Sequence, residues 1–175
     1  MSNELGHDPG CVSLLVMGIG NVLKGDDGVG PYVVGLLVKH ADEEHAGTPS
    51  QRISAIDCGT VPENYTGVVR RLHPDHLVLV DAADMGLEAG AVRTIAADMI
   101  GALGLSTHSM PLSMFMSYVE KLVGRTTLVG VQPKTMNLGA DMCQQVRTAG
   151  EEVAKLLREG NLGDISPLGK DITCR

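Results

Sequence analysis

The sequence predicts an α/β protein with three α/β/α layers around a mostly parallel, twisted sheet. Short apolar runs alternate along the chain with longer segments whose apolar residues recur at helical spacing, as in strands joined by helices. The apolar runs are continuous, which is typical of strands buried on both faces. With 175 residues, a single domain over 1–175 is expected, with its core at 12–158. Residues 1–10 and 160–175 are expected to pack loosely.

Each element has its own signal. The run 12–17 predicts the first strand, and Pro31 predicts the start of a helix that ends near residue 44. The weakly alternating segment 92–96 predicts an edge strand, which could run antiparallel to its neighbour. The other expected elements are strands at 52–57, 77–80 and 127–131, and helices at 62–72, at 111–122 and within 138–158.

Composition and charge narrow the classes of function. The net charge is −7 and the chain contains no Trp, one Phe and three Tyr, so a nucleic-acid partner is not expected. The acidic balance disfavours an anionic membrane surface, and no apolar run is long enough for a membrane span. Residues 1–10 lack the pattern of a signal peptide. We therefore expect a cytoplasmic protein without membrane insertion.

The turn at 18–30 is the most informative stretch of the chain. Glycines follow the first strand, and the adjacent acids Asp26 and Asp27 come next. Two carboxylates would repel a nucleotide phosphate, and Leu23 replaces the third glycine of the dinucleotide fingerprint. The turn is therefore better suited to offering oxygen ligands. Neighbouring side chains of an extended segment point opposite ways, so only one of the two acids is expected to enter a site.

Further polar residues are predicted at the same edge of the sheet as Asp27. Asp81 ends the third buried strand, Asp57 ends the second, and His108 precedes a predicted helix. Ligands of such sheets bind beyond the carboxyl ends of the strands, so these residues should converge. Two carboxylates and an imidazole suit a divalent transition metal with open coordination positions. Taken singly, each Asp could cap a turn or a helix, and His108 could be an exposed loop residue.

No hydroxyl or thiol has the surroundings of a nucleophile. The serines close to His108 in sequence are better explained as helix caps than as activated groups. Cys58 follows Asp57, and nothing basic beside it would lower the pKa of its thiol. None of the four cysteines belongs to a Cys-x-x-Cys pair, so a structural role is expected for all of them.

Several segments resemble one family of enzymes. The turn Gly18-Ile-Gly-Asn-Val-Leu-Lys-Gly-Asp-Asp-Gly-Val-Gly30 resembles the opening motif of the hydrogenase maturation endopeptidases. The resemblance covers nearly all of 12–158 in the same order, and its further segments are 57–64, 79–86, 107–112 and 128–133. The segments that look most like the branch acting on hydrogenase 3 and related membrane-bound hydrogenases are 84–86, 108–112 and 130–133.

The resemblance implies both an activity and a set of residues. The activity is removal of a C-terminal extension from the large-subunit precursor of a nickel–iron hydrogenase after nickel insertion. The implied catalytic and metal-contacting residues are Asp27, Asp81 and His108, and the metal is nickel supplied by the precursor. The segment from Asp57 to Gly59 departs from the commoner Asp-Gly-Gly of the family, which affects backbone freedom beside the site.

Two other functions stay open from the sequence. A nonenzymatic nickel-site chaperone for hydrogenase assembly would use the same acids and histidine. A nucleotide- or flavin-binding module would use the glycine turn and the α/β pattern. The roles of Asp26 and Asp57 also stay open, although exchange of Asp26 for Ala is expected to be milder than the same exchange of Asp27.

Overall fold

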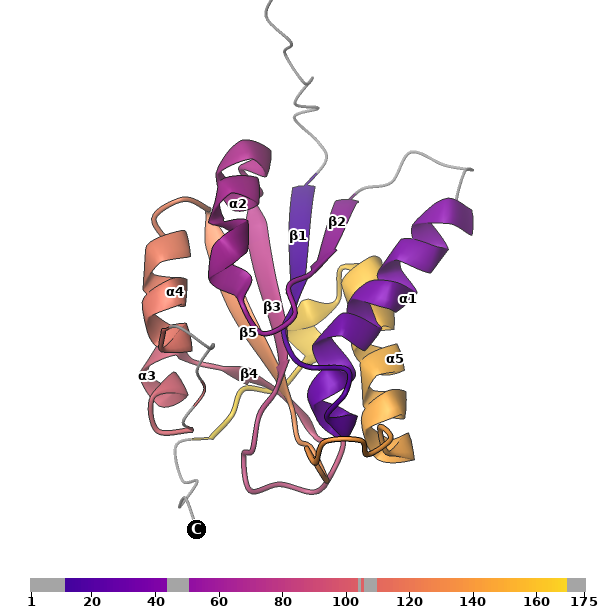
Figure 1. The fold of residues 1–175 in the computed structure, drawn as a ribbon. Helices are drawn as coiled ribbons and strands as arrows, with labels where there is room; N and C mark the ends of the chain where they lie inside the picture. Colours follow the sequence, from indigo (N-terminus) through magenta and orange to yellow (C-terminus); the bar gives the residue numbers. More distant parts are fainter. Residues whose placement is uncertain (1–11, 44–50, 104, 106–109, 170–175) are drawn as a thin grey trace, which may run out of the picture.

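The structure is a computed structural model that describes residues 12–43, 51–103, 105 and 110–169. Its centre is a five-stranded sheet in the order β2-β1-β3-β5-β4 (Figure 1). The strands are β1 (Val12–Gly18), β2 (Gln51–Asp57), β3 (His76–Ala82), β4 (Val92–Ile95) and β5 (Arg125–Val131). All neighbours pair in parallel except β4, which is antiparallel to β5. The predicted fold class and the antiparallel edge strand are confirmed.

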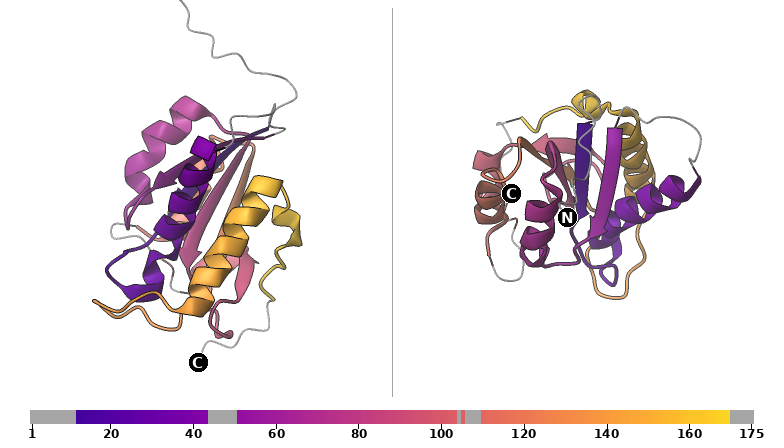
Figure 2. Two further views of the ribbon diagram at one scale, coloured as in Figure 1. Left: turned by 90° about the vertical axis from the view of Figure 1, so that its right-hand side faces the viewer. Right: turned by 90° about the horizontal axis from the view of Figure 1, so that it is seen from above.

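Helices cover both faces of the sheet. In Figures 1 and 2, α1 and α5 lie side by side on one face, and α2, α3 and α4 cover the other. The helices are α1 (Val29–Glu43), α2 (Thr66–Leu72), α3 (Ala97–Ile100), α4 (Leu112–Val119) and α5 (Gln144–Glu159), and the 3-10 turns are η1 (Gly25–Gly28), η2 (Pro62–Tyr65) and η3 (Leu162–Asp164). Within the described ranges, no helix is both long enough and apolar enough to cross a membrane.

The inner strands contribute to two cores at once. In β1, Leu15 and Met17 pack with residues of α2 and α4, while Leu14 and Val16 pack with residues of α1 and α5. All four side chains are almost fully buried. Successive residues of a strand point to opposite faces, so a strand between two helical layers must be apolar at every position. This explains the continuous apolar runs of the sequence.

The chain after α5 is packed against the sheet as far as it is described, up to residue 169, although loose packing was expected from residue 160 onward. The N–H of Thr94 in β4 donates to the carbonyl of Ser166 (3.1 Å between N and O), and the N–H of Leu168 donates to the carbonyl of Thr94 (2.8 Å). Leu168 is buried in the core on the α4 side. This segment therefore covers the outer edge of β4. The ends of the chain lie outside the described residues.

The turn from β1 into α1 lies against the end of β3. The N–H of Ile19 donates to the carbonyl of Val80 (2.8 Å). A Cβ on Gly30, in the first turn of α1, would lie 2.2 Å from the carbonyl oxygen of Ile19 and 2.5 Å from that of Val80. Only glycine fits there, and its small size lets α1 begin directly over the strand ends.

Substitution of Gly30 tests this close approach. Gly30→Ala is expected to lower the free energy of unfolding by about 1–3 kcal/mol, because the added methyl group overlaps backbone atoms that cannot easily move. Gly35 lies in the same helix, and a Cβ there would meet nothing within 4 Å. Gly35→Ala should therefore raise the free energy of unfolding by about 0.5–1 kcal/mol. Urea unfolding measures both, and stabilisation by Gly30→Ala would contradict the packing described.

Candidate active site at the carboxyl ends of the strands

Two of the three predicted site residues lie together at the carboxyl ends of the strands. Asp27 lies in η1, after β1, and Asp81 is the residue before the last of β3. Asp81 is 8% exposed. Burial raises the pKa of Asp81 to about 7, helped by the negative charge of Asp27 and opposed by the N–H of Ala82. The two carboxylates are thus close enough to repel each other, and Asp81 is held partly protonated near neutral pH.

The local structure of the turn holds Asp27 in place. Its side chain is partly buried, and its Oδ2 accepts the N–H of Asn21 (3.0 Å between N and O). The Asn21 side chain in turn accepts the N–H of Leu23 (2.9 Å). The carboxylate is therefore fixed across the glycine turn at the end of β1.

His108, the third predicted ligand, lies outside the described residues. Within the part of the chain that the structure describes, no three His, Cys, Asp or Glu side chains are grouped so that they could hold a metal ion. The geometry of the site therefore concerns the carboxylate pair, and the ligand role of Asp27, Asp81 and His108 stays a prediction.

Asp26 does not join this pair. Its carboxylate is 0% exposed and accepts backbone N–H groups of Lys134 (2.8 Å), Thr135 (2.9 Å) and Cys143 (2.7 Å). Burial alone would raise the pKa of Asp26, but these donors outweigh it and hold the pKa below its usual value. Asp26 and Asp27 separate because successive residues of a 3-10 helix differ by a third of a turn, and not because the segment is extended.

Asp57 lies near the pair and has a local role. Its side chain is exposed, and its Oδ1 accepts the N–H of Gly59 (2.9 Å), an interaction typical of Asp in a turn. It also lines an open depression of about 380 Å³ beside η1. The residues around this depression are Val22, Gly25, Gly28, Pro31, Tyr32, Asp57, Ala140, Asp141, Met142 and Arg147. A ligand in the depression would lie next to the turn that carries Asp27.

The environment of Cys58 fits a structural role. The side chain is buried, and burial raises the pKa of the thiol to about 12, with a further contribution from the charge of Asp57. Cys58 and Cys143 are both free thiols. A thiol that stays protonated is a poor nucleophile, which agrees with the expectation from the sequence. Cys11 and Cys174 lie outside the described residues.

Sequence reasoning assigned no role to Gln132, which organises the loop after β3. Its buried Oε1 accepts the N–H groups of Met85 (2.7 Å) and Leu87 (3.1 Å). Its Nε2 donates to Oδ1 of Asp84 (3.0 Å) and to the carbonyl of Pro133 (3.1 Å). A polar residue directly after a buried strand, at the edge where the acids lie, was the signal that could have identified it.

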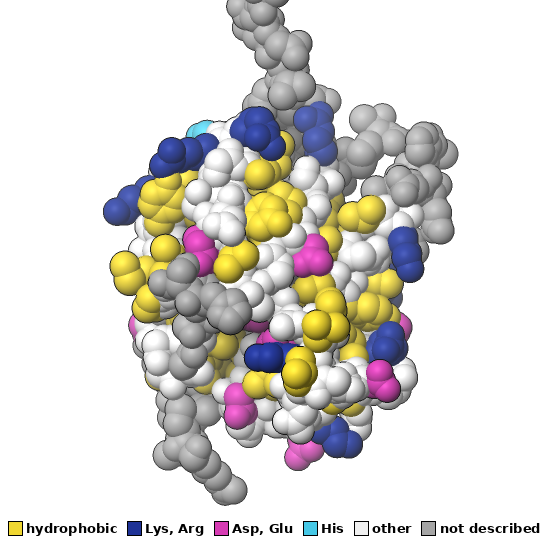
Figure 3. Space-filling model, viewed as in Figure 1, with side chains coloured by type: hydrophobic (Ala, Val, Ile, Leu, Met, Phe, Trp, Pro, Cys, Tyr) yellow, Lys and Arg dark blue, Asp and Glu magenta, His cyan; other side chains and the backbone are white. Residues whose placement is uncertain are grey.

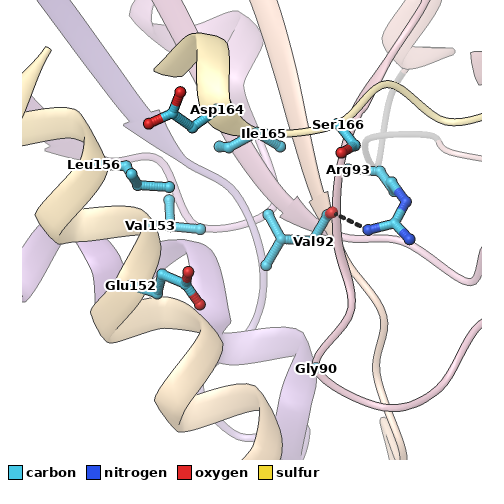
Figure 4. Close-up of a pocket in the computed structure, with 9 residues that line it drawn as sticks. All are labelled: Gly90, Val92, Arg93, Glu152, Val153, Leu156, Asp164, Ile165 and Ser166. Carbon is cyan, nitrogen blue, oxygen red and sulfur yellow. Dashed lines mark hydrogen bonds between the residues drawn. The ribbon is translucent and has the colours of Figure 1, made fainter. Parts of the chain in front are cut away.

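A second hollow lies away from the carboxylate pair. It measures about 220 Å³ and is bounded by β4, α5 and the segment around η3. In Figure 4, Val92, Val153 and Leu156 face one another across it, whereas Arg93 extends away and donates to the carbonyl of Val92. None of the predicted site residues lines this hollow.

Charge is unevenly distributed over the face seen in Figure 3. Lys and Arg side chains gather without acidic neighbours at the end where the parallel strands begin, whereas nearer the opposite end acidic side chains are mixed with further Lys and Arg. Two of the basic residues, Arg70 and Arg71, belong to the last turn of α2. The candidate site thus lies at the end away from this basic group.

Comparison with known proteins places this arrangement in a family. The family model for hydrogenase maturation proteases matches residues 32–159. The chain is 35% identical over 148 residues to the hydrogenase 3 maturation protease of Escherichia coli K12, covering 83% of this chain and 90% of that protein. The chain belongs to the hydrogenase maturation protease family. The resemblance found in the motifs is thereby confirmed.

Other relatives agree with this assignment. A putative hydrogenase maturation protease of Methanocaldococcus jannaschii is 35% identical over 150 residues, covering 85% of this chain and 88% of that protein. A crystal structure of a hydrogenase 3 maturation protease superimposes with a TM-score of 0.76 at 34% identity and covers 90% of this chain and 97% of that one. A nickel–iron hydrogenase maturation protease from Thermococcus kodakarensis gives 0.69 at 31% identity, with 86% and 92% covered.

Family membership decides between the functions that the sequence left open. The chain is an enzyme, a peptidase of the hydrogenase maturation family. The carboxylate pair is the candidate active site of this peptidase, because it lies at the carboxyl ends of the parallel strands, where ligands of such sheets bind.

Asp81 should make stability depend on pH in a defined direction, and its substitution by Asn should remove that dependence. The native pKa of about 7 exceeds that of an unfolded Asp, about 3.9. Between these values the native carboxyl binds more protons than the unfolded one, so its contribution to stability falls as pH rises. Asn cannot ionise, so the stability advantage of Asp81→Asn over the unsubstituted protein should grow from about pH 4 to about pH 7 and then level off.

Thermal melts from pH 4 to pH 8 measure this difference. Asp164→Asn, in the exposed turn η3, is the control for loss of an exposed carboxylate elsewhere in the chain. An advantage for Asp81→Asn that is independent of pH would mean that Asp81 ionises normally.

Proposed function

We propose that this protease removes the C-terminal extension of a nickel–iron hydrogenase large-subunit precursor after nickel has been inserted. The observation that carries the proposal is the placement of two carboxylates, Asp27 and Asp81, at the strand ends, where the turn that carries Asp27 is hydrogen-bonded to the end of β3. Among the described residues, the raised pKa of the Cys58 thiol makes this side chain a poor nucleophile, which supports chemistry that does not pass through a covalent bond to Cys58.

The repulsion between Asp27 and Asp81 supports recognition of a cation. An empty pair of close carboxylates is costly, and a divalent ion between them relieves that cost. Oxygen donors from Asp27 and Asp81, joined by an imidazole nitrogen from His108, suit nickel and leave positions for the ligands of the precursor. In this proposal nickel arrives with the substrate, and the enzyme recognises the loaded precursor by completing its coordination.

The residues of the enzyme then act on the peptide bond beside the metal. Nickel carried by the substrate supplies Lewis acidity, which polarises a carbonyl or activates water. Asp27 is held by Asn21 at the mouth of the turn, where its carboxylate can orient a water molecule toward the scissile bond. In the metal-free enzyme the pKa of Asp81 is raised to about 7, so its carboxyl can release its proton at neutral pH when the cation arrives.

The surface around η1 supports a protein substrate. Four large apolar side chains are exposed on the loops beside the depression, namely Val22 (66%), Leu23 (64%), Met136 (43%) and Leu138 (76%). The two loops that carry them are joined by a hydrogen bond from the N–H of Gly139 to the carbonyl of Leu23 (2.8 Å). Such a surface can bury apolar residues of a precursor while its scissile bond lies at the carboxylates. The compartment expected from the sequence, the cytoplasm, stays a prediction.

Asp27→Asn and His108→Ala are expected to lower cleavage of nickel-loaded precursor by about 100-fold or more, because each loses a group at the reacting centre. Both variants should keep the melting temperature of the unsubstituted protein within a few degrees. Asp164→Asn, far from the strand ends, is the matched control and should cleave normally. The released peptide is detected by mass spectrometry, and normal cleavage by Asp27→Asn would contradict the proposed site.

Nickel dependence is tested by offering nickel-free and nickel-loaded precursor side by side. The nickel-free precursor is expected to remain uncut even with excess enzyme, because the coordination sphere is completed only by the loaded substrate. Cleavage of nickel-free precursor by enzyme incubated with metal would show that the enzyme carries its own metal. Binding of loaded precursor without any cleavage would contradict the proposed reaction on this precursor.

A further inference from the structure

We propose that Asp26 is a positioning residue of this protease: its buried carboxylate joins the loop of Asp27 to the segment 133–143 and thereby fixes the place of Asp27. The inference rests on the proposed function, since it concerns the same site. Asp26 would touch neither substrate nor metal. It would act on the reaction only through Asp27.

The hydrogen bonds of Asp26 are too distant in sequence for a helix cap or a turn. Its acceptor oxygens are bonded by N–H groups of Lys134, Thr135 and Cys143, which lie 108, 109 and 117 residues further along the chain. The N–H of Asp26 also donates to the carbonyl of Thr135 (3.0 Å). A single residue of η1 therefore makes four hydrogen bonds to the segment that connects β5 with α5.

These bonds leave little freedom for the turn that holds Asp27. η1 contains only four residues, Gly25–Gly28, and the direction of each side chain follows from that of its neighbour in a 3-10 turn. Once the carboxylate of Asp26 is bonded on both oxygens, the backbone of Asp27 is fixed, and the N–H of Asn21 fixes its side chain. A shift of about 1 Å in a catalytic group can cost about 100-fold in rate.

The same bonds hold the wall of the depression beside the site. Residues 140–142 line that depression together with Gly25 and Gly28, which flank the two acids. The N–H of Cys143, the residue before the first turn of α5, donates a hydrogen bond to the carboxylate of Asp26. Asp26 thus couples the position of Asp27 to that of the segment across the depression.

The structure gives the expectation for substitutions of Asp26 a physical basis. From the sequence alone, loss of its carboxylate is expected to be milder than loss of the carboxylate of Asp27. In the structure, Asp26→Asn keeps the size of the side chain but places an amide NH₂ group against at least one backbone N–H, because both oxygens act as acceptors. At least one of the three bonds to the carboxylate must therefore break.

Asp75 provides a matched control at the other end of the sheet. Its Oδ2 accepts the N–H (2.8 Å) and the hydroxyl (2.9 Å) of Ser13, and so joins the loop before β3 to the start of β1. Asp75→Asn removes the same charge from a side chain that also bonds a distant backbone N–H, but at the amino ends of the strands, and its amide oxygen can keep both bonds to Ser13. It should leave the catalytic carboxylates in place.

The experiment compares Asp26→Asn, Asp75→Asn and Asp27→Asn on nickel-loaded precursor, at a temperature where all are folded by circular dichroism. For Asp26→Asn we expect kcat to fall about 10- to 100-fold, with KM for the precursor changed less than threefold. Asp75→Asn should retain the kcat of the unsubstituted protein. A second measurement is the NMR chemical shift of the Asn21 amide, whose N–H donates a hydrogen bond to Asp27. This chemical shift should change in Asp26→Asn and stay the same in Asp75→Asn.

The outcomes separate this inference from the proposed function. Equal kcat values for Asp26→Asn, Asp75→Asn and the unsubstituted protein, with Asp27→Asn inactive, would overturn the positioning role alone. Full activity of Asp27→Asn would overturn the proposed site itself. If Asp26→Asn does not fold, Lys134→Pro is the second variant, because it removes one of the three N–H donors and leaves the carboxylate in place. It should lower kcat by a smaller factor than Asp26→Asn. An unchanged kcat in Lys134→Pro would overturn the positioning role of Asp26.

Discussion

The close approach of the β1–α1 turn to the end of β3 is the constraint on which the site depends. The bond from the N–H of Ile19 to the carbonyl of Val80 and the missing side chain of Gly30 bring the turn within contact of β3. Two carboxylates from elements about fifty residues apart in sequence then share one strand end. Without this contact, Asp27 would be an ordinary exposed acid and Asp81 would be an isolated one.

Two buried carboxylates in this region, Asp26 and Asp81, have pKa values shifted in opposite directions. Asp26 receives three backbone donors, and its pKa is held below the usual value. Asp81 is buried beside another acid, and its pKa is raised to about 7. The first arrangement favours a permanent negative charge that serves as a structural connection. The second holds the carboxyl partly protonated near neutral pH, so its charge state can respond to a change in its surroundings.

Much of this could be predicted from the sequence, because it depends on the order of elements and on strand polarity. Continuous apolar runs indicated strands between two helical layers, and residues at the carboxyl ends of parallel strands had to share an edge, which brought Asp27 and Asp81 together. Long-range hydrogen bonds leave no such signal. Nothing local shows that the N–H groups of Lys134 and Cys143 reach Asp26, that Gln132 organises the loop after β3, or that the chain beyond α5 returns to β4.

That return of the chain has a consequence for how the molecule behaves in solution. An edge strand offers unpaired N–H and carbonyl groups to any other extended chain, and β4 is the last strand on its side of the sheet. Thr94 has both its N–H and its carbonyl engaged by the segment containing Ser166 and Leu168. The segment therefore occupies backbone groups of the edge strand that could otherwise pair with a strand of another molecule. Shortening the protein after α5 would free these groups and leave a sheet edge open to self-association.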